Sequence, residues 1–229
     1  FNDTLTGDAG ANVLNGGDGD DTLQGAAGGD ALQGGNGNDT ISYAASNAGV
    51  MLSLSSNTAS GGDAAGDSFS SIENVIGSAF ADTINGQAGA NILDGGAGDD
   101  VLAGRGGADT LRGGTGSDTA NYVASGAVTI NLATNTANGG DATGDTFNSI
   151  ENITGSNSAD TLTGDAGANT LDGGAGNDAL QGGAGGDALI GGAGTDTASY
   201  AASAAGVTVS LSTFKAIGGD AAGDSFSSI

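Results

Sequence analysis

Single aliphatic residues recur along most of the chain, and each one stands between small or polar residues. The segments GGDGDDTLQ (16–24) and GGAGDDVLA (95–103) are typical. This alternation predicts a very short β-strand with one inward side chain. The residues before the strand are rich in glycine, which predicts a tight turn through backbone conformations with positive φ. The pattern therefore predicts a succession of strands and turns with a period of nine residues.

The nine-residue unit is found in fourteen full copies. Position six is Asp in eleven copies and Asn in three, and position eight is Leu or Ile in twelve copies and Ala in two. Two positions maintained over so many copies make chance periodicity a poor explanation. The apolar residues are therefore placed for a repeating fold and not scattered along the chain.

A longer repeat contains the blocks of nine-residue units. Its clearest markers are the tyrosines at 43, 122 and 200, which are 79 and 78 residues apart. We expect one continuous solenoid over 1–229, made of super-repeats 1–76, 77–154 and 155–229, the last of them truncated. Because solenoids normally carry terminal caps and none is evident, we expect the chain to be a fragment of a larger protein.

Composition excludes a conventional thick core and adds a charge problem. The chain has 48 glycines, 4% aromatic residues, and no proline, cysteine, tryptophan or histidine. It has 27 acidic and three basic residues, for a formal net charge of -24, which opposes compaction unless cations neutralise it. Such a composition is also typical of intrinsic disorder, but the periodic apolar residues favour a fold. A chain this acidic lacks the basic face that nucleic acid requires.

The nine-residue unit closely resembles the repeats-in-toxin (RTX), or haemolysin-type, calcium-binding repeat, whose pattern is GGxGxDxUx. Copies such as GGNGNDTIS (34–42) and GGAGNDALQ (173–181) carry the resemblance, which covers most of the chain. It implies an all-β parallel β-roll, a β-solenoid in which two repeats form one 18-residue coil. Two parallel sheets would face each other across a thin Leu/Ile seam that cannot alone offset the entropy of ordering the coil.

The resemblance also implies calcium between loops that stack eighteen residues apart. Calcium binds six to eight oxygens and accepts backbone carbonyls, which a glycine-rich loop presents without steric hindrance. We expect roughly eight to ten ions, which would supply about +16 to +20 against the charge of the chain. By resemblance, the side-chain ligand is the position-six aspartate: Asp21, Asp30, Asp39, Asp82, Asp100, Asp109, Asp118, Asp160, Asp178, Asp187 and Asp196.

Further ligands are expected from related positions. Carboxylates or amides in the position-six role are Asp3, Asp67, Asp145, Asp224, Asn12, Asn91 and Asn169. Backbone carbonyls are expected from positions one to four: Gly16, Gly17, Asp18, Gly19, Gly34, Gly35, Asn36, Gly37, Gly95, Gly96, Ala97, Gly98, Gly113, Gly114, Thr115, Gly116, Gly173, Gly174, Ala175, Gly176, Gly191, Gly192, Ala193 and Gly194. The alternative for any single copy is that Asp and Gly only form a turn.

Departures from the repeat predict weaker sites. The three copies with Asn at position six offer a neutral amide, which is a poorer calcium ligand than a carboxylate. The loops GSAFAD (77–82) and GSNSAD (155–160) lack two of the glycines, and we expect them to cap one side of an ion stack.

Between the blocks, over 43–76 and 122–154, the nine-residue period lapses. Alternation persists at 50–54, 128–132 and 207–211, which predicts longer strands there. The phrase GGDAAGDSF (61–69 and 218–226), or GGDATGDTF (139–147), reads as the repeat with one residue inserted. We expect the solenoid to continue through these segments as wider coils, with Asp63, Asp141 and Asp220 as further candidate ligands or as turn residues.

The resemblance implies a calcium-binding structural module of an extracellular bacterial protein, secreted by a type I system and folding as calcium binds. A rigid spacer is the favoured role, with a cell-surface adhesin or surface-layer protein, or the calcium-binding part of a secreted enzyme, as alternatives. No catalytic site is expected, because histidine and cysteine are absent and the carboxylates recur instead of forming a unique pair. No membrane insertion is expected, and binding of glycans or of a second copy through the solenoid faces stays open.

Overall fold

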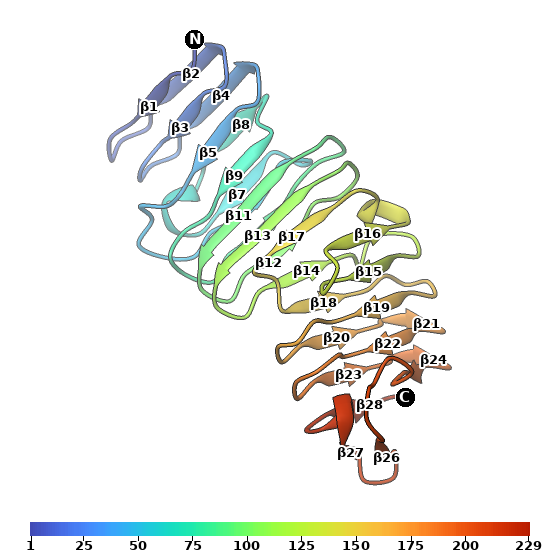
Figure 1. The fold of residues 1–229 in the computed structure, drawn as a ribbon. Coiled ribbons are helices and arrows are strands. Elements are labelled where there is room, and N and C mark those ends of the chain that lie inside the picture. The colour runs from blue at the N-terminus through green and yellow to red at the C-terminus, as the bar shows by residue number, and fades with distance from the viewer. The chain divides into compact units, whose positions relative to one another are not determined.

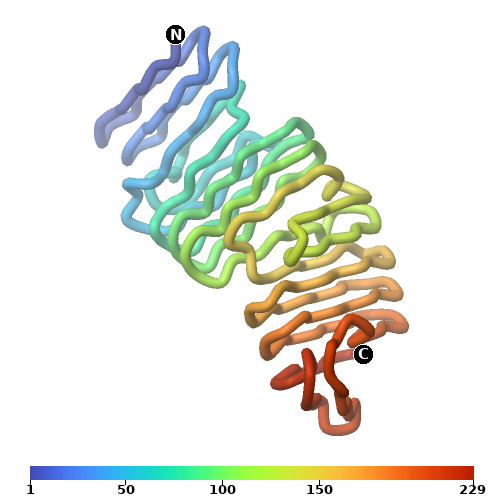
Figure 2. Tube along the Cα trace, viewed as in Figure 1, coloured from blue at the N-terminus to red at the C-terminus, as the bar shows by residue number.

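The computed structural model describes all residues, 1–229, and is built almost entirely of short β-strands (Figure 1). Three single-turn 3-10 helices are the other regular elements. The chain divides into two compact units, Phe1–Asp118 and Thr119–Ile229. Within each unit the chain winds in coils that lie side by side, as the tube in Figure 2 shows.

The first unit contains thirteen strands and one 3-10 helix. Most strands have three residues, and the longer ones extend into the glycine-rich loop. The elements are β1 (Thr4–Thr6), β2 (Val13–Asp18), β3 (Thr22–Gln24), β4 (Ala31–Asn36), β5 (Thr40–Ser42), β6 (Met51–Ser53), β7 (Thr58–Ser60), η1 (Gly62–Ala64), β8 (Ser68–Ser70), β9 (Asn74–Ile76), β10 (Thr83–Asn85), β11 (Ile92–Ala97), β12 (Val101–Ala103) and β13 (Thr110–Thr115).

Parallel pairing with a shift of eighteen residues organises this unit. Leu5 is paired with Leu23 and Leu93 with Leu111, so position eight of one repeat lies beside position eight two repeats later. The strand orders are β1-β3-β5-β9-β11-β13, β12-β10-β6-β7 and β2-β4-β8. The predicted all-β parallel roll with 18-residue coils is thus confirmed within the blocks of repeats.

The core of the first unit is the predicted aliphatic seam. Leu23, Ile41, Ile84 and Leu111 have no exposed surface at all, whereas the residues on either side of each are partly exposed or polar. Burial of each such side chain contributes about 1.5–3 kcal/mol. One buried aliphatic residue per nine is a thin core, so the loops must supply further stability.

Close stacking of the loops requires glycine at position two of the repeat. Gly35 has φ +120°, and a Cβ added there would lie 2.0 Å from the carbonyl oxygen of Gly17. Gly114 has φ +108°, and its added Cβ would lie 1.9 Å from the oxygen of Gly96. Any side chain here would both strain the backbone and push neighbouring coils apart.

The segment between the first two blocks forms a wider coil, as expected. Ile41 is paired with Val75, and Leu32 with Phe69, so the parallel ladder resumes after 34 and 37 residues. The prediction of a longer strand over 50–54 is wrong, because β6 covers only Met51–Ser53 and then turns back into an antiparallel hairpin with β7. Asn57, at φ +52°, forms part of that turn.

The second unit repeats this architecture. Its elements are β14 (Thr119–Asn121), β15 (Thr129–Asn131), β16 (Thr136–Asn138), η2 (Gly140–Ala142), β17 (Thr146–Asn148), β18 (Asn152–Thr154), β19 (Thr161–Thr163), β20 (Thr170–Asp172), β21 (Ala175–Gly176), β22 (Ala179–Gln181), β23 (Ala188–Ile190), β24 (Ala193–Gly194), β25 (Thr197–Ala198), β26 (Thr208–Ser210), β27 (Lys215–Ile217), η3 (Gly219–Ala221) and β28 (Ser225–Ser227).

Register in the second unit follows the same rule. Leu162 is paired with Leu180 at a shift of eighteen residues, and Leu189 with Phe226 across a wide coil. The predicted longer strands over 128–132 and 207–211 are again short, because β15 and β26 turn back into hairpins with β16 and β27. One continuous solenoid over 1–229 stays a prediction. None of the helices in the structure is long and apolar enough to cross a membrane.

Truncation of one seam residue tests how much the thin core contributes. Leu32→Ala should lower the free energy of unfolding by about 2–5 kcal/mol, because Leu32 is 1% exposed and its removal leaves a cavity. Urea unfolding in saturating calcium measures the change. Val13→Ala, at a residue on the neighbouring strand that is 75% exposed, is the matched control and should change little. Equal effects of the two variants would contradict the seam as the core.

Candidate metal sites

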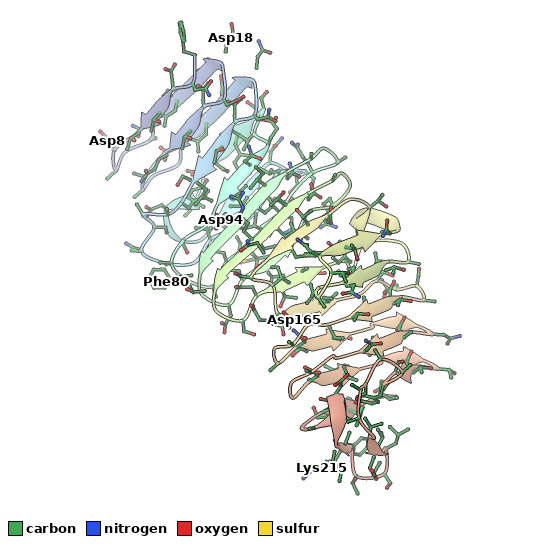
Figure 3. The ribbon with its side chains drawn as sticks, viewed as in Figure 1. Asp8, Asp18, Phe80, Asp94, Asp165 and Lys215 are labelled. Carbon is green, nitrogen blue, oxygen red and sulfur yellow. The ribbon has the colours of Figure 1, made fainter.

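All position-six aspartates except the half-buried Asp196 are buried in the loops that connect the strands. Asp21, Asp39, Asp100 and Asp178 are all at most 2% exposed. The acidic residues Asp8 and Asp18, labelled in Figure 3, are by contrast exposed at the outer edge of the first unit. Burial of an ionised carboxylate is strongly unfavourable unless hydrogen bonds and opposite charge compensate it. The position-six side chains therefore require specific partners.

One oxygen of each carboxylate holds neighbouring coils together. The backbone N–H of Asp21 donates to Asp39 Oδ1 at 2.8 Å, and the N–H of Asp82 donates to Asp100 Oδ1 at 2.8 Å. In the second unit the N–H of Asp160 donates to Asp178 Oδ1 in the same way. Successive position-six residues thus form a ladder with a step of eighteen residues. The structure therefore brings together the aspartates that the sequence places on one edge of a coil.

The second oxygen of these carboxylates is buried without a hydrogen-bond partner. The residues concerned are Asp21, Asp30, Asp39, Asp100, Asp178 and Asp187. An unsatisfied buried carboxylate oxygen is rare in proteins and indicates a missing positive partner. A bare Oδ2 repeated at one position of the repeat fits a bound cation.

A small space beside each of these oxygens exists because position one is glycine. A Cβ added to Gly16 would lie 2.2 Å from Asp21 Oδ2 and 2.7 Å from the carbonyl oxygen of Gly34. A Cβ added to Gly95 would lie 2.2 Å from Asp100 Oδ2 and 2.8 Å from the oxygen of Gly113. A carboxylate from one coil and a carbonyl from the next therefore face the same space. Hard oxygen ligands of this kind are the ones that calcium prefers.

No group of three or more acidic residues gathers in the structure closely enough to hold a metal ion. An ion at these loops must therefore take most of its ligands from the backbone. The positions that were predicted to supply carbonyls lie in or beside strands β2, β4, β11, β13, β21 and β24. Some of those carbonyls are engaged in the ladder, since Gly19 N–H donates to Asn36 O and Gly98 N–H donates to Thr115 O. Which carbonyls bind metal stays a prediction.

The loops with a serine at position two satisfy their own aspartate. Ser78 N–H donates to Asp82 Oδ2 at 2.5 Å, and Ser78 Oγ–H donates to Asp82 Oδ1 at 2.8 Å. Ser156 makes the same pair of bonds to Asp160. The two aspartates were predicted ligands, but in each of them both oxygens already accept hydrogen bonds. That these loops cap an ion stack stays a prediction.

The loops with asparagine at position six close in a similar way. Asn91 Oδ1 accepts the N–H of Gln87 at 2.8 Å, and Asn169 Oδ1 accepts the N–H of Asp165 at 2.8 Å. Asn12 makes the equivalent bond with Asp8. The amide oxygen that would bind calcium is thus already used within the loop. Asp3, another predicted ligand, has an exposed side chain, and its N–H donates to Asp21 Oδ1.

In the wider coils, an aspartate takes the position-six place in the ladder. Asp30 N–H donates to Asp67 Oδ1 at 2.8 Å, and Asp187 N–H donates to Asp224 Oδ1 at 2.9 Å. The repeat with one inserted residue had predicted this role for Asp67, Asp145 and Asp224. Asp63, Asp141 and Asp220 lie instead in the 3-10 helices and are half-buried.

Sequence reasoning missed two partners in these coils. Glu73 Oε2 accepts the N–H of Asp39 at 2.8 Å and so provides the carboxylate that follows Asp39 in its stack. The hydroxyl of Tyr43 donates to Asp67 Oδ2 at 2.8 Å. The recurrence of Tyr, and of Glu73 and Glu151, at equivalent points of the super-repeat was the available signal, but the tyrosines indicated only the length of the super-repeat.

Burial makes several of these carboxylates weak acids. Burial raises the pKa of Asp100 to about 7, against a lowering by the hydrogen bond from Asp82 N–H, and repulsion by Asp82 and Asp118 adds to the increase. Burial likewise raises the pKa of Asp187 to about 6. The pKa of Asp178 is raised for the same reason. Without a cation, these three carboxyl groups therefore bind a proton at a higher pH than an ordinary aspartate does.

Metal-free protein should become less stable as the pH rises. A carboxyl whose pKa is higher in the folded state stabilises the fold fully below its ordinary pKa of 3.8, and this contribution is lost as the pH rises through about 6 for Asp187 and 7 for Asp100. Circular dichroism of calcium-depleted protein at a series of pH values measures the trend as a falling folded fraction. In saturating calcium the trend should reverse, because calcium competes with protons. A metal-free chain that gains stability from acidic to neutral pH would contradict the assignment.

The comparison with known families agrees with this geometry. The family described as RTX calcium-binding nonapeptide repeat (4 copies) matches residues 1–32, 15–47, 69–102, 88–120, 145–180 and 164–198. No curated protein matches the chain. The matched residues make up well over half of the sequence and include the loops with bare carboxylate oxygens. The chain belongs to the RTX calcium-binding nonapeptide repeat family and is a calcium-binding repeat module.

Proposed function

We propose that the chain is a calcium-gated structural spacer, in which ions between successive loops join the coils into a rigid roll. The observation that carries the proposal is the row of buried Oδ2 atoms without a hydrogen-bond partner, each beside a glycine at position one. Calcium supplies positive charge and cross-links a carboxylate of one coil to carbonyl oxygens of the next. The proposed carboxylate ligands with a bare Oδ2 are Asp21, Asp30, Asp39, Asp100, Asp178 and Asp187. Asp109, Asp118 and Asp196 are proposed from their equivalent position in the repeat.

The proposed number of ions remains roughly eight to ten, one for each loop that holds one of these aspartates, called an open loop below. The self-closed loops at Asp82, Asp160 and the three asparagines are proposed to hold the roll where no ion binds or where an ion binds weakly. The formal charge of -24 is then largely neutralised by the ions. Carbonyls at positions one to four of the repeat complete each coordination shell.

We propose that the protein acts outside the cell. Extracellular calcium modules bind calcium at about 10⁻⁴ to 10⁻³ M, so the chain would stay unfolded in a low-calcium cytosol and fold after export. The absence of cysteine and proline suits a chain that crosses a membrane unfolded, because neither disulfides nor slow proline isomers delay folding. The family resemblance points to a type I secretion system as the export route.

A cell-surface adhesin or surface-layer protein is the second candidate. The super-repeat favours it, because β6–β7, β15–β16 and β26–β27 form equivalent hairpins that would recur along a longer array. A calcium-binding part of a secreted enzyme is a third setting, in which the catalytic residues would belong to another part of the protein. The absence of histidine and cysteine argues against a catalytic role for this chain itself.

Calcium titration tests the proposed function. The chain should show the circular dichroism of an unfolded polypeptide in chelator at neutral pH, and should gain β-structure cooperatively at calcium concentrations of about 10⁻⁴ to 10⁻³ M. Magnesium should be much less effective, because it demands a smaller and more regular shell. A spectrum that does not respond to calcium would remove the basis for the proposal.

One pair of variants separates a ligand from a surface charge. Asp100→Asn should raise the calcium concentration at the folding midpoint roughly tenfold, because it replaces a buried carboxylate ligand by an amide. Asp99→Asn is the matched control, because Asp99 is adjacent and exposed and its substitution removes the same charge. Calcium titration followed by circular dichroism measures both. Equal midpoints for the two variants would show that Asp100 acts only through net charge.

A further inference from the structure

All three tyrosines of the chain make the same contact. Tyr43 Oη–H donates to Asp67 Oδ2 at 2.8 Å, Tyr122 to Asp145 Oδ2 at 2.7 Å, and Tyr200 to Asp224 Oδ2 at 2.6 Å. Each pair belongs to the wide coil of one super-repeat. A hydroxyl that donates to an ionised carboxylate makes a short, charge-assisted bond that is stronger than a neutral one.

Backbone hydrogen bonds hold Tyr43 and Tyr122 in this position. Tyr43 N–H donates to Ile76 O at 2.8 Å, and Tyr43 O accepts the N–H of Ser46 at 2.9 Å. The side chains of Tyr43 and Asp67 are almost completely buried. Tyr122 is held by the equivalent bonds to Thr154 and Ser125. The backbone that carries the tyrosine is therefore fixed, and the hydroxyl that contacts the carboxylate is not a mobile surface group.

The tyrosine hydroxyl donates to the Oδ2 atom of its aspartate. The same atom has no hydrogen-bond partner in the loop of Asp30. Asp30 and Asp67 are neighbours in one ladder, in which Asp30 N–H donates to Asp67 Oδ1. Asp30 Oδ2 has no hydrogen-bond partner, whereas Asp67 Oδ2 accepts the tyrosine hydroxyl. Asp187 and Asp224 differ in the same way.

The glycine cradle of the open loops is also missing around Asp67. A Cβ added to Gly61 would first meet Gly49 O, and one added to Gly62 would first meet Ser46 Oγ and Ala48 O. Neither places a carbonyl of the next coil beside the carboxylate, as Gly16 does for Asp21. In the first unit, β8 is moreover the end strand of the sheet β2-β4-β8, so Asp67 belongs to the final coil of that stack.

We propose that a tyrosine hydroxyl takes the place of a calcium ion at one loop of each super-repeat, so that Tyr43–Asp67, Tyr122–Asp145 and Tyr200–Asp224 close their coils without metal. Asp67, Asp145 and Asp224 are then not calcium ligands, although the inserted repeat had predicted them as such. The hydroxyl supplies Oδ2 with the hydrogen-bond donor that Asp30 Oδ2 and Asp187 Oδ2 lack. This inference rests on the proposed calcium-binding function of the other loops.

The ion count of two matched variants tests the proposal. Native mass spectrometry of the full chain at saturating calcium should show the wild-type number of ions for Asp67→Asn, and at least one ion fewer for Asp30→Asn. The two residues are neighbours in one stack and both are buried, so each substitution removes one buried charge. Loss of an ion from Asp67→Asn equal to the loss from Asp30→Asn would overturn the proposal.

The pair Asp224→Asn and Asp187→Asn repeats the comparison in the second unit, in case one of the first variants does not fold. A wild-type chain that binds no calcium would overturn both the proposed function and this inference. A wild-type chain that binds calcium, with an ion lost from Asp67→Asn and from Asp224→Asn, would overturn this inference alone.

A second readout examines the hydroxyl itself. Tyr43→Phe should lower the midpoint of thermal unfolding in saturating calcium by a few degrees, because Asp67 Oδ2 loses its donor while the ring is retained. The double variant Tyr43→Phe with Asp67→Asn should lose less than the sum of the two single changes. Additive shifts, or a Tyr43→Phe variant with the wild-type midpoint, would show that the ring serves only as packing.

Discussion

The burial of a row of carboxylates inside thin loops is the constraint on which the structure depends. One oxygen of each position-six aspartate accepts a hydrogen bond from a backbone N–H of the preceding coil. The side chain therefore cannot move outward without breaking this contact between coils. The other oxygen is then confined beside a glycine and has to be satisfied in place. The repeat solves this in three ways: a cation, a donor within the loop, or a tyrosine from the wide coil.

The aliphatic seam and the loops have separate roles in the fold. The seam determines register, because each Leu or Ile is paired with its counterpart eighteen residues away. It is too thin to stabilise the coils against the entropy of the chain, since one buried side chain serves nine residues. Under the proposed function, the missing stability comes from the edges of the coils, where bound calcium would neutralise the carboxylates.

Much of this organisation could be predicted from the sequence because it is periodic. The nine-residue spacing predicted the strands and turns, and the resemblance to the RTX repeat implied the shift of eighteen residues and the aspartates that share an edge. The structure has all three. The hairpins after Leu52, Ile130 and Val209 could not be predicted in this way. Alternation of apolar and polar residues is the same for one longer strand as for a short strand with an antiparallel return.

The differences among the candidate sites were even less accessible. Asp30 and Asp67 both look like ligands in the sequence, and only their surroundings separate them, since one Oδ2 is bare and the other accepts a tyrosine hydroxyl. The serine at position two was noticed as a lost glycine, but its donation to Asp82 depends on the conformation of the loop. Contacts between residues distant in sequence and local loop geometry are not encoded in the period.

The central claim is that a calcium ion lies between successive loops at each bare carboxylate oxygen. The most direct measurement is anomalous diffraction at long wavelength from crystals grown with calcium, because it locates the ions independently of any assumed ligand. The account predicts anomalous peaks beside Oδ2 of Asp21 and Asp100, within coordination distance of the carbonyls of Gly34 and Gly113. Well-ordered loops with the same carboxylates and no peak beside them would contradict it.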